Sequence, residues 1–329
     1  MFYEKVISNL DDYKIHQNQI KMLKMYNKDT IPNILLYGPK NSGKKNLIKN
    51  YIKYLFGLEK LDYTIKVYNI KINNNDVKIT IKQSLYFLEI KLCEYGLYDK
   101  HVLCDFIKNI ADNKSVTNNY RIIIVNDIGS TTKNAQLALR RMMETLVKST
   151  RFFFTTNSRS NLDDAIVSRC YSIRIPLPNN LELTEHIKSL SSVYEINLTN
   201  QQINKIIKKS KRNLYLVNML LIDDNLKYED PINFIVKELN THILNKNINF
   251  LEKIRTIIYK AHLLNYSTSD IIKSYLNYIF EKKIFTDHEC MLISQEAALN
   301  EHQNCIGKKP FYNLEKLFIF IKRIVIQKK

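Results

Sequence analysis

The stretch LYGPKNSGKKNL, residues 36–47, decides how the rest of the chain is interpreted. It fits the phosphate-binding pattern G-x-x-x-x-G-K-[ST] from Gly38 through Lys44, but Lys45 stands where the pattern has a serine or threonine. Backbone N–H groups of such a loop form an anion site, and its lysine reaches the outer phosphates. The stretch therefore predicts a nucleotide-binding loop that lacks one magnesium ligand. A purely structural glycine turn is the alternative.

The residues on both sides of the loop favour the nucleotide site. Residues 31–37, IPNILLY, form a short apolar run that is typical of a buried parallel strand. Residues 44–56 have apolar side chains at helical spacing, and Gly57 would end that helix. The order of strand, glycine loop and helix is the context that a phosphate-binding loop requires.

Two more apolar runs, YRIIIVND at 120–127 and TRFFFTTN at 150–157, predict buried strands, and helical patterns occupy 82–112 and 133–148. This alternation implies an α/β domain with a parallel sheet and helices on both faces. Ligands of such sheets bind at the carboxyl ends of the strands. We therefore expect the nucleotide site to contain Gly38, Pro39, Lys40, Asn41, Ser42, Gly43, Lys44, Lys45, Asn46, Asp127 and Asn157.

Asn157 would hydrogen-bond a terminal phosphate from the end of its strand, although a turn-forming asparagine is an equally good interpretation. Residues 173–180, with two prolines and two asparagines, end the sheet region. Residues 182–226 have only helical patterns, and another break falls at 227–233. The layout is thus an α/β nucleotide domain (1–175), a small helical domain (176–229) and a helical C-terminal domain (230–329).

Composition adds weaker constraints. The chain has 329 residues, and its 50 Lys and Arg against 32 Asp and Glu give a net charge of +18, which attracts polyanions. Overuse of Lys, Asn and Ile through an AT-rich genome is an alternative source of that charge. An odd number of cysteines, five, without pairwise spacing predicts a reduced intracellular protein.

Membrane and metal sites find little support in the sequence. The longest apolar run, residues 317–321, is far short of the roughly 20 residues that a membrane span needs. Four potential zinc ligands near the C-terminus lack the tight spacing of structural sites, so we assign no metal-binding residues; they are His288, Cys290, His302 and Cys305.

Hydrolysis of a nucleotide needs oxygens that this site does not supply. A loop hydroxyl and a carboxylate after the second strand hold the metal, and another group positions the attacking water. Lys45 has no oxygen, Asn126 stands at the first acidic position, and Asp127 is one methylene shorter than the usual glutamate. We expect the site to bind ATP or ADP, to hold Mg²⁺ weakly or not at all, and to hydrolyse ATP slowly or never.

Three stretches together resemble the small subunits of replication factor C, the eukaryotic AAA+ clamp loader: YGPKNSGKK at 37–45, IIIVNDIGSTTKNAQLALRRMMETL at 122–146, and FFFTTNSRSNLDDAIVSRCYSIRIPLP at 152–178. The resemblance extends over nearly the whole chain. It implies an AAA+ P-loop domain, a helical lid and a helical collar that joins sister subunits. The Gly-Lys-Lys of the loop is similar to the end-of-ring subfamily, called subunit 3 in animals and subunit 5 in budding yeast, whose degenerate site holds nucleotide without turning it over.

The sequence Ser168-Arg169-Cys170 matches the S-R-C motif of that family. The resemblance implies that Arg169 reaches the γ-phosphate held by a neighbouring subunit and acts there as an arginine finger. Without the family, Arg169 is an ordinary surface arginine before a packed cysteine.

The helix expected at 133–148 has a core stripe at three-to-four spacing, and Lys133, Gln136 and Arg140 fall on the opposite side. The resemblance implies that these three side chains contact the DNA backbone without reading sequence. A solvated helix face is the alternative.

The resemblance also implies partners and a location: sister subunits in a heteropentamer, a ring-shaped sliding clamp, primer–template DNA, and the nucleus. Two departures weaken nucleotide contacts. The family's K-Y-R-P near the adenine pocket is replaced by KVIS at residues 5–8, and Tyr215 occupies the place of a phosphate-binding lid arginine. Two rival functions remain open at this point, a self-sufficient P-loop ATPase and a basic DNA-binding module with a vestigial nucleotide site.

Overall fold

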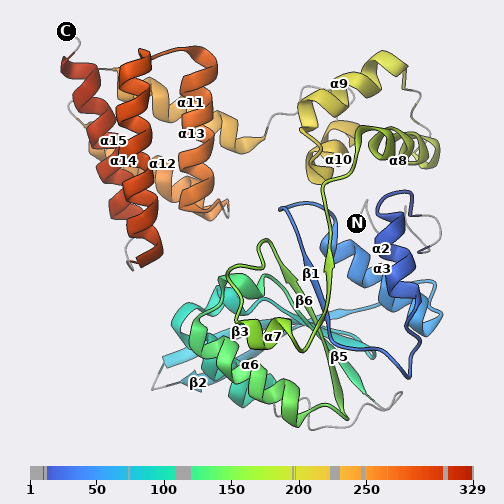
Figure 1. Ribbon diagram of the computed structural model, residues 1–329. Helices are drawn as coiled ribbons and strands as arrows, with labels where there is room; N and C mark the ends of the chain where they lie inside the picture. The colour runs from blue at the N-terminus through green and yellow to red at the C-terminus, as the bar shows by residue number, and fades with distance from the viewer. Residues whose placement is uncertain are drawn as a thin grey trace. The chain divides into compact units, whose positions relative to one another are not determined.

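The computed structural model describes residue 10 and residues 13–72, 75–107, 120–194, 196, 198–222, 230–245, 249–264, 266–306 and 310–327. The chain forms two compact units, Met1–Leu226 and Lys227–Lys329 (Figure 1). The KVIS stretch at 5–8 lies outside the described residues. Each unit is considered by itself below.

A seven-stranded sheet forms the centre of the first unit, in the order β2-β3-β4-β5-β6-β1-β7. Five adjacent strands run parallel: β4 (Phe87–Ile90), β5 (Arg121–Val125), β6 (Thr150–Thr156), β1 (Ile34–Tyr37) and β7 (Tyr171–Arg174). The strands expected at 31–37, 120–127 and 150–157 are therefore confirmed as β1, β5 and β6.

The edge of the sheet next to β4 differs from the expectation. An antiparallel hairpin of β2 (Thr64–Ile72) and β3 (Asn75–Gln83) extends the sheet beyond its parallel part. The helix expected at 82–112 is wrong over its first part, because β4 occupies Phe87–Ile90. Helical turns follow only from residue 92, as η2 (Leu92–Tyr98), α4 (Asp99–His101) and η3 (Val102–Ile107).

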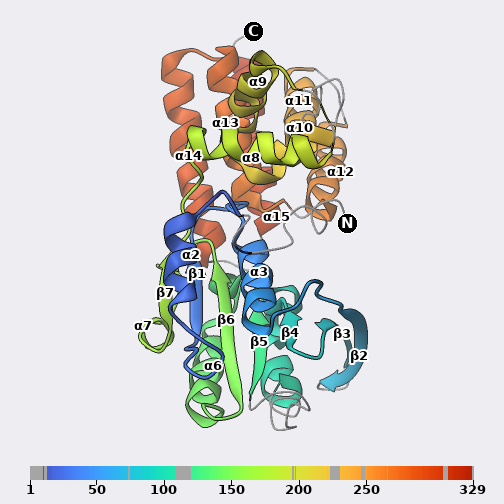
Figure 2. The same ribbon diagram turned by 90° about the vertical axis from the view of Figure 1, so that its right-hand side faces the viewer.

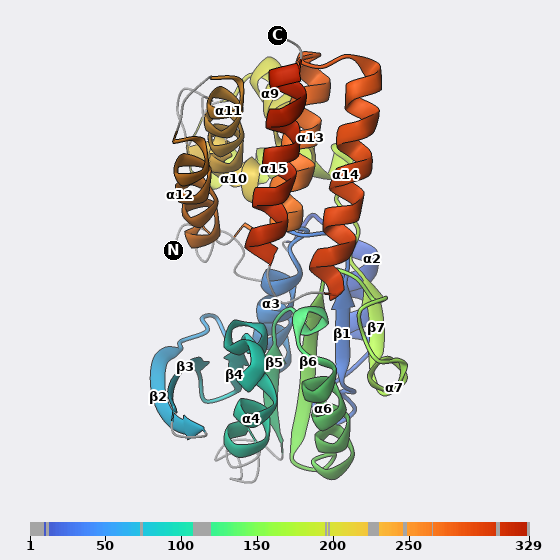
Figure 3. The same ribbon diagram turned by 90° about the vertical axis from the view of Figure 1, so that its left-hand side faces the viewer.

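Helices cover both faces of the sheet, as expected for this fold class. Figures 2 and 3 view the unit from opposite sides. The helices α2 (Gln17–Lys24) and α3 (Lys44–Phe56) lie in front of the sheet in Figure 2, and α4 and α6 (Lys133–Thr145) lie in front of it in Figure 3. The sequence determines both faces, because alternate residues of a strand point to opposite sides. Phe152 and Phe154 pack in the cluster with α6, whereas Phe153 stacks on Tyr51 of α3 at 6.1 Å between ring centroids.

A side-chain cap fixes the start of α6, the helix that follows Asp127 in the sequence. After η4 (Ile128–Ser130), the hydroxyl of Thr132 accepts a hydrogen bond from the Ala135 N–H and thereby caps α6. The carboxylate of Asp99 in turn accepts from both the N–H (2.7 Å) and the hydroxyl (2.9 Å) of Thr132. The start of α6 is therefore fixed to α4 as well as to its own cap.

The first unit ends in three helices, α8 (Asn180–Val193), α9 (Asn200–Ser210) and α10 (Leu214–Ile222). They follow the short helix α7 (Asp164–Val167) and strand β7. Both α8 and α9 begin at capping boxes, with Asn179 and Thr199 as their N-caps. The region expected to contain only helices at 182–226 does so over its described residues.

In its described residues the second unit is helical, with α11 (Pro231–Leu244), α12 (Phe250–Leu263), α13 (Thr268–Lys282), α14 (Asp287–Ile306) and α15 (Pro310–Gln327). Its core is aliphatic and aromatic, with Tyr275 of α13 packed edge-on against Phe318 of α15 at 5.4 Å. None of the helices in the described part of the chain combines the length and apolar character needed to cross a membrane.

Candidate nucleotide-binding site

The loop that opens the site requires glycine at its first position. Gly38 has φ 153°, and a Cβ atom added there would lie 2.0 Å from the carbonyl oxygen of Ile175. Its N–H donates to the carbonyl of Thr156 at 3.3 Å. The loop therefore starts in a space bounded by the end of β6 and the chain that leaves β7, where no side chain fits.

The second glycine of the pattern lets two other segments approach the loop. Gly43 has φ 93°, and a Cβ there would lie 3.0 Å from the hydroxyl oxygen of Tyr13 and 3.2 Å from Cδ1 of Leu214. Nε2 of the buried His16 donates to the carbonyl of Ser42 at 2.9 Å, and burial lowers the pKa of His16. The N-terminal segment and α10 thus both contact the loop.

Lys44 is held at the centre of the site. Its ammonium donates to the carbonyl oxygens of Gly38 (2.7 Å) and Pro39 (2.6 Å), and lies 3.3 Å from Oδ1 of Asn157. The amide of Asn157 in turn donates to Oδ1 of Asp127 at 3.3 Å. Three predicted site residues, one from the start of α3 and two from the ends of β5 and β6, therefore lie together.

Burial changes the acidity of that lysine. Lys44 is only 8% exposed, and this lowers its pKa from 10.5 to about 8, although nearby Asp127 acts in the opposite direction. A phosphate beside the ammonium would favour its charged form. The other predicted loop residues vary in exposure: Pro39, Lys40, Asn41 and Lys45 are exposed, Gly43 and Asn46 are half-buried, and Ser42 is buried.

A buried glutamate that the sequence gave no reason to select engages Asn126. Nδ2 of Asn126 donates to Oε1 of Glu89 on β4 at 2.7 Å, and Oδ1 of Asn126 accepts from the Thr155 hydroxyl at 3.3 Å. Asn126 is 3% and Glu89 9% exposed, and the ammonium of Lys49 lies 3.8 Å from Glu89. Both ends of the Asn126 amide are therefore occupied within the protein, which leaves it a poor metal ligand.

Asp127 also departs from ordinary strand-end geometry. Its backbone is left-handed (φ 57°, ψ 44°), and its N–H donates to the hydroxyl of Thr155 at 3.1 Å. Its carboxylate is shared with Asn157. The residues present offer one carboxylate and no loop hydroxyl at position 45 for a metal ion.

The helix α6 carries the three residues expected to contact DNA. Lys133 is exposed, and the Arg140 side chain is 43% exposed. The expectation that Gln136 lies on the same solvent face is wrong, because this side chain is 4% exposed. Its amide donates to the Asn161 carbonyl at 3.1 Å and accepts from the Asp163 N–H at 2.9 Å, so Gln136 fixes the loop before α7 to α6.

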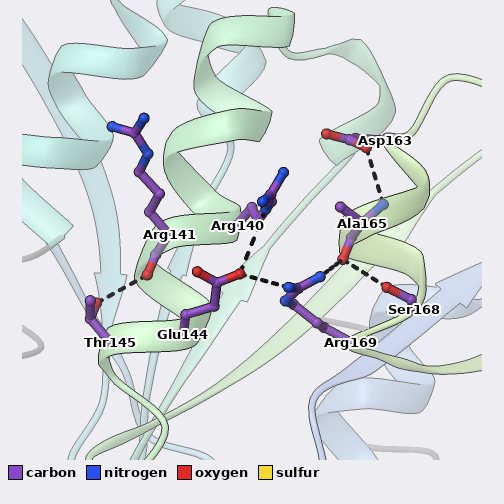
Figure 4. A network of polar contacts seen from close by, with 8 residues as sticks. All are labelled: Arg140, Arg141, Glu144, Thr145, Asp163, Ala165, Ser168 and Arg169. Carbon is purple, nitrogen blue, oxygen red and sulfur yellow. Dashed lines mark hydrogen bonds and ion pairs between the residues drawn. The ribbon is translucent and has the colours of Figure 1, made fainter.

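Arg169 lies beside α6 directly after α7 (Figure 4). Its Nη1 donates to the Ala165 carbonyl at 2.8 Å, and its Nη2 to Oε1 of Glu144 at 2.6 Å. The Arg169 side chain is 37% exposed. Burial raises the pKa of the adjacent Cys170 thiol to about 12, so that residue is a packing residue and no nucleophile.

Tyr215, expected in place of a lid arginine, stands in the first turn of α10. It is 46% exposed, and its N–H donates to Oδ1 of Asn213 at 3.0 Å. The neighbouring Leu214 is the residue that contacts the loop at Gly43. At this end of α10 the side chain in contact with the loop is therefore apolar, and the residue next to it carries an uncharged phenol.

Comparison with known proteins gives consistent matches. The sequence model of the family described as DNA polymerase III, delta subunit, matches residues 15–179. The chain is 28% identical to the probable replication factor C subunit 3 of Dictyostelium discoideum, over 94% of this chain and 93% of that protein. It is 26% identical to replication factor C subunit 5 of Saccharomyces cerevisiae, over 87% of each.

Among solved structures, the Thermotoga maritima RuvB Holliday junction branch migration motor is similar, with a TM-score of 0.50 and 15% identity. The structural match covers 86% of this chain and 81% of the RuvB chain, and it shows a similarity of fold alone. The resemblance to replication factor C subunits 3 and 5 is confirmed, and so is the fold class of an AAA+ domain followed by helical domains.

Proposed function

The chain belongs to the DNA polymerase III delta subunit family, and on that premise we propose that it is a clamp-loader subunit of the replication factor C type which binds nucleotide but does not hydrolyse it efficiently. The observation that carries this proposal is the contrast within the site. The loop and Lys44 are intact, whereas position 45 has no hydroxyl and Asn126 is bonded to Glu89. Phosphate binding survives under these conditions, and metal-assisted hydrolysis does not.

The nucleotide is ATP or ADP, with Mg²⁺ held weakly or not at all. Lys44, Asn157 and the backbone of residues 38–44 supply contacts that suit the phosphates of either one. Tyr215 cannot neutralise a terminal phosphate as a guanidinium would, so the two nucleotides should bind with similar affinity. Long occupancy by one nucleotide follows from a site that cannot turn it over.

Arg169 supplies the catalytic contribution of the subunit to a neighbour. Its guanidinium is partly exposed, and its two hydrogen bonds go to the Ala165 carbonyl and to Glu144 and not to the network of Lys44, Asp127 and Asn157. A guanidinium supplied in trans stabilises charge on the transferring phosphoryl group, which accelerates turnover by about 10³ to 10⁵. The partners are sister subunits in a heteropentamer.

Exposed cations of α6 suit the second partner, primer–template DNA. Lys133 and Arg140 lie on α6 and are partly or fully exposed, and contacts from such side chains to phosphates position a protein without reading bases. The complex would set a ring-shaped sliding clamp on this DNA in the nucleus. The net charge of +18 favours these encounters.

The test is ATP turnover by the reconstituted complex with Arg169→Ala in this subunit. Turnover at one neighbouring site should be lost, while assembly and retained nucleotide stay unchanged. Arg159→Ala, which removes another exposed arginine of the same unit, is the matched control and should have no effect. An unchanged rate in the Arg169→Ala complex contradicts the trans role.

Two further measurements separate the rival functions. The isolated chain should turn over ATP far more slowly than the roughly 1 per second of an ordinary enzyme. Brisk turnover by the isolated chain would instead identify a self-sufficient ATPase. Salt-sensitive DNA binding by the monomer, with no nucleotide retained through purification, would identify a basic DNA-binding module.

A further inference from the structure

One carboxylate oxygen lies between the two arginines to which the proposed function assigns different partners. Oε1 of Glu144 accepts from Nη2 of Arg169 at 2.6 Å and lies 3.6 Å from Nε of Arg140, as Figure 4 shows. Arg140 and Glu144 are one turn apart on α6, whereas Arg169 comes from the segment after α7. Glu144 is thus the residue that joins the DNA-facing helix to the finger.

The two contacts of Glu144 differ in strength. The bond to Arg169 is short and charge-assisted, and a second bond from Nη1 of Arg169 to the Ala165 carbonyl holds the same guanidinium. Two bonds to two different elements fix the plane of the guanidinium. Arg140 has only the longer ion pair, and its buried Nε makes no hydrogen bond within the described residues.

This asymmetry predicts how the cluster responds to a polyanion. A DNA phosphate attracts Arg140, whose hold on Glu144 is weak. When Arg140 moves to the phosphate, the whole negative charge of Glu144 is available to Arg169. The finger is then held more firmly, at the moment when its orientation toward a neighbour's nucleotide matters.

We propose that Glu144 is a positioning residue that couples DNA contact at Arg140 to the placement of Arg169. The inference rests on the proposed function, because it takes both arginines in the roles given above. Glu144 itself touches neither DNA nor nucleotide. Glu144 should affect the ratio of DNA-stimulated to basal turnover. Without DNA its carboxylate interacts with both arginines, and with DNA bound it interacts with Arg169 alone.

The expected size follows from the exposure of the cluster. The side chains of Arg140, Glu144 and Arg169 are 37–45% exposed, and an ion pair in such a setting changes an equilibrium by up to about fivefold. Glu144→Ala should therefore reduce the stimulation ratio by about two- to fivefold. Glu144→Gln keeps an acceptor for Arg169 without the charge and should lie between Glu144→Ala and the natural protein.

The experiment measures ATP turnover of the reconstituted complex against the concentration of primer–template DNA. Glu144→Ala should lower the maximal rate and leave the half-saturating DNA concentration unchanged, whereas Arg140→Ala should raise that concentration. In the Arg169→Ala background, Glu144→Ala should cause no further loss. Glu185→Gln, the same change of charge at an exposed position on α8, is the control and should behave as the natural protein.

The outcomes distinguish failure of this inference from failure of the proposed function. If Arg169→Ala has no effect, the trans role itself is wrong and the inference is overturned with it. If Arg169→Ala slows turnover but both Glu144 variants keep the natural stimulation ratio, only the coupling is wrong. An equal fall of basal and stimulated rates means a merely structural role, and a rise in basal rate means that Glu144 restrains the finger; either result overturns the proposal.

Discussion

Restoring an aspartate at position 126 should damage the protein more than it helps the site. Asn126→Asp returns the acidic residue of an active nucleotide site, but it replaces an N–H donor with a second carboxylate beside Glu89. Asn126 is 3% and Glu89 is 9% exposed, and Nδ2 of Asn126, which the substitution replaces with an oxygen, lies 2.7 Å from Oε1 of Glu89. Two like charges at that separation in a buried setting cannot both stay ionised.

The structure sets the size of the penalty. At an effective dielectric constant of about 20, two unit charges about 3 Å apart repel by roughly 5 kcal/mol. Taking up a proton instead costs about 1.4 kcal/mol for each pH unit above a normal carboxyl pKa of about 4. Proton uptake is the cheaper course at pH 7, where it costs about 4 kcal/mol, against about 1.4 kcal/mol at pH 5.

The sign of the pH dependence follows from the raised pKa of the folded pair. The folded variant binds a proton that the unfolded chain releases, so its stability falls as pH rises from about 4 toward the raised pKa. Thermal unfolding of the full chain checks this. The melting temperature of the first unit should fall by about 8–16 °C at pH 7 and by much less at pH 5.

A double variant provides the control. Asn126→Asp with Glu89→Gln exchanges the carboxylate and the amide, so one donor again faces one acceptor and stability should return. An Asn126→Asp variant as stable as the natural protein at pH 7, or equally destabilised at both pH values, would refute the reasoning. Neither variant should gain brisk ATP turnover, because Lys45 still has no hydroxyl.

Three other predictions concern the phosphate loop. Affinity for ATP or ADP should weaken about tenfold from pH 7 to pH 9, because bound phosphate needs charged Lys44, whose pKa is about 8, and affinity is lost as pH rises through that value; calorimetric titration checks this, and Lys44→Arg should remove the pH dependence. Gly38→Ala should abolish nucleotide retention, since its Cβ would lie 2.0 Å from the Ile175 carbonyl oxygen. Gly57→Ala is the control, because Gly57 has φ 64° but no atom within 4 Å of the added Cβ. This control should cost only about 1–2 kcal/mol of unfolding free energy, measured by urea denaturation. Lys45→Thr should strengthen Mg²⁺-dependent binding by at most about tenfold and leave turnover far below about 1 per second, because Asn126 is still bonded to Glu89; vigorous hydrolysis by this variant would contradict the account of the site.

The parts of the fold that could be predicted were those buried on both faces. The runs that became β1, β5 and β6 are apolar at consecutive positions, which only strands covered on two sides require. The hairpin was missed although Val77, Ile79 and Ile81 alternate with polar residues, the period of a strand with one covered face. Strand β4 was missed because the charged Glu89 interrupts its apolar run, and the contacts that Asn126 and Lys49 make with this carboxylate are not visible in the sequence.

The candidate site shows the same limit. The spacing of the loop glycines predicted the anion site because the positive φ angles of Gly38 and Gly43 belong to the backbone of the loop itself, and glycine adopts them without strain. By contrast, the burial of Gln136 depends on the Asn161–Asp163 segment that covers it, and the pattern of α6 carries no trace of that segment. Glu144 was missed for a similar reason, since its partner Arg169 is 25 positions away in the sequence.

Ile175, whose carbonyl excludes a side chain from Gly38, is also the first residue of the connection from β7 to α8. The Ile175 N–H donates to the Tyr37 carbonyl at 2.8 Å, and from here the chain leaves the sheet for α8 through Pro176 and Pro178, whose rings stiffen it. A displacement of α8 to α10 would therefore act directly on the phosphate loop, on Gly38 through Ile175 and on Gly43 through Leu214 of α10. Since both glycines of the loop are in contact with this connection or with these helices, binding in the loop and binding to the outer surface of α8 to α10 would influence each other.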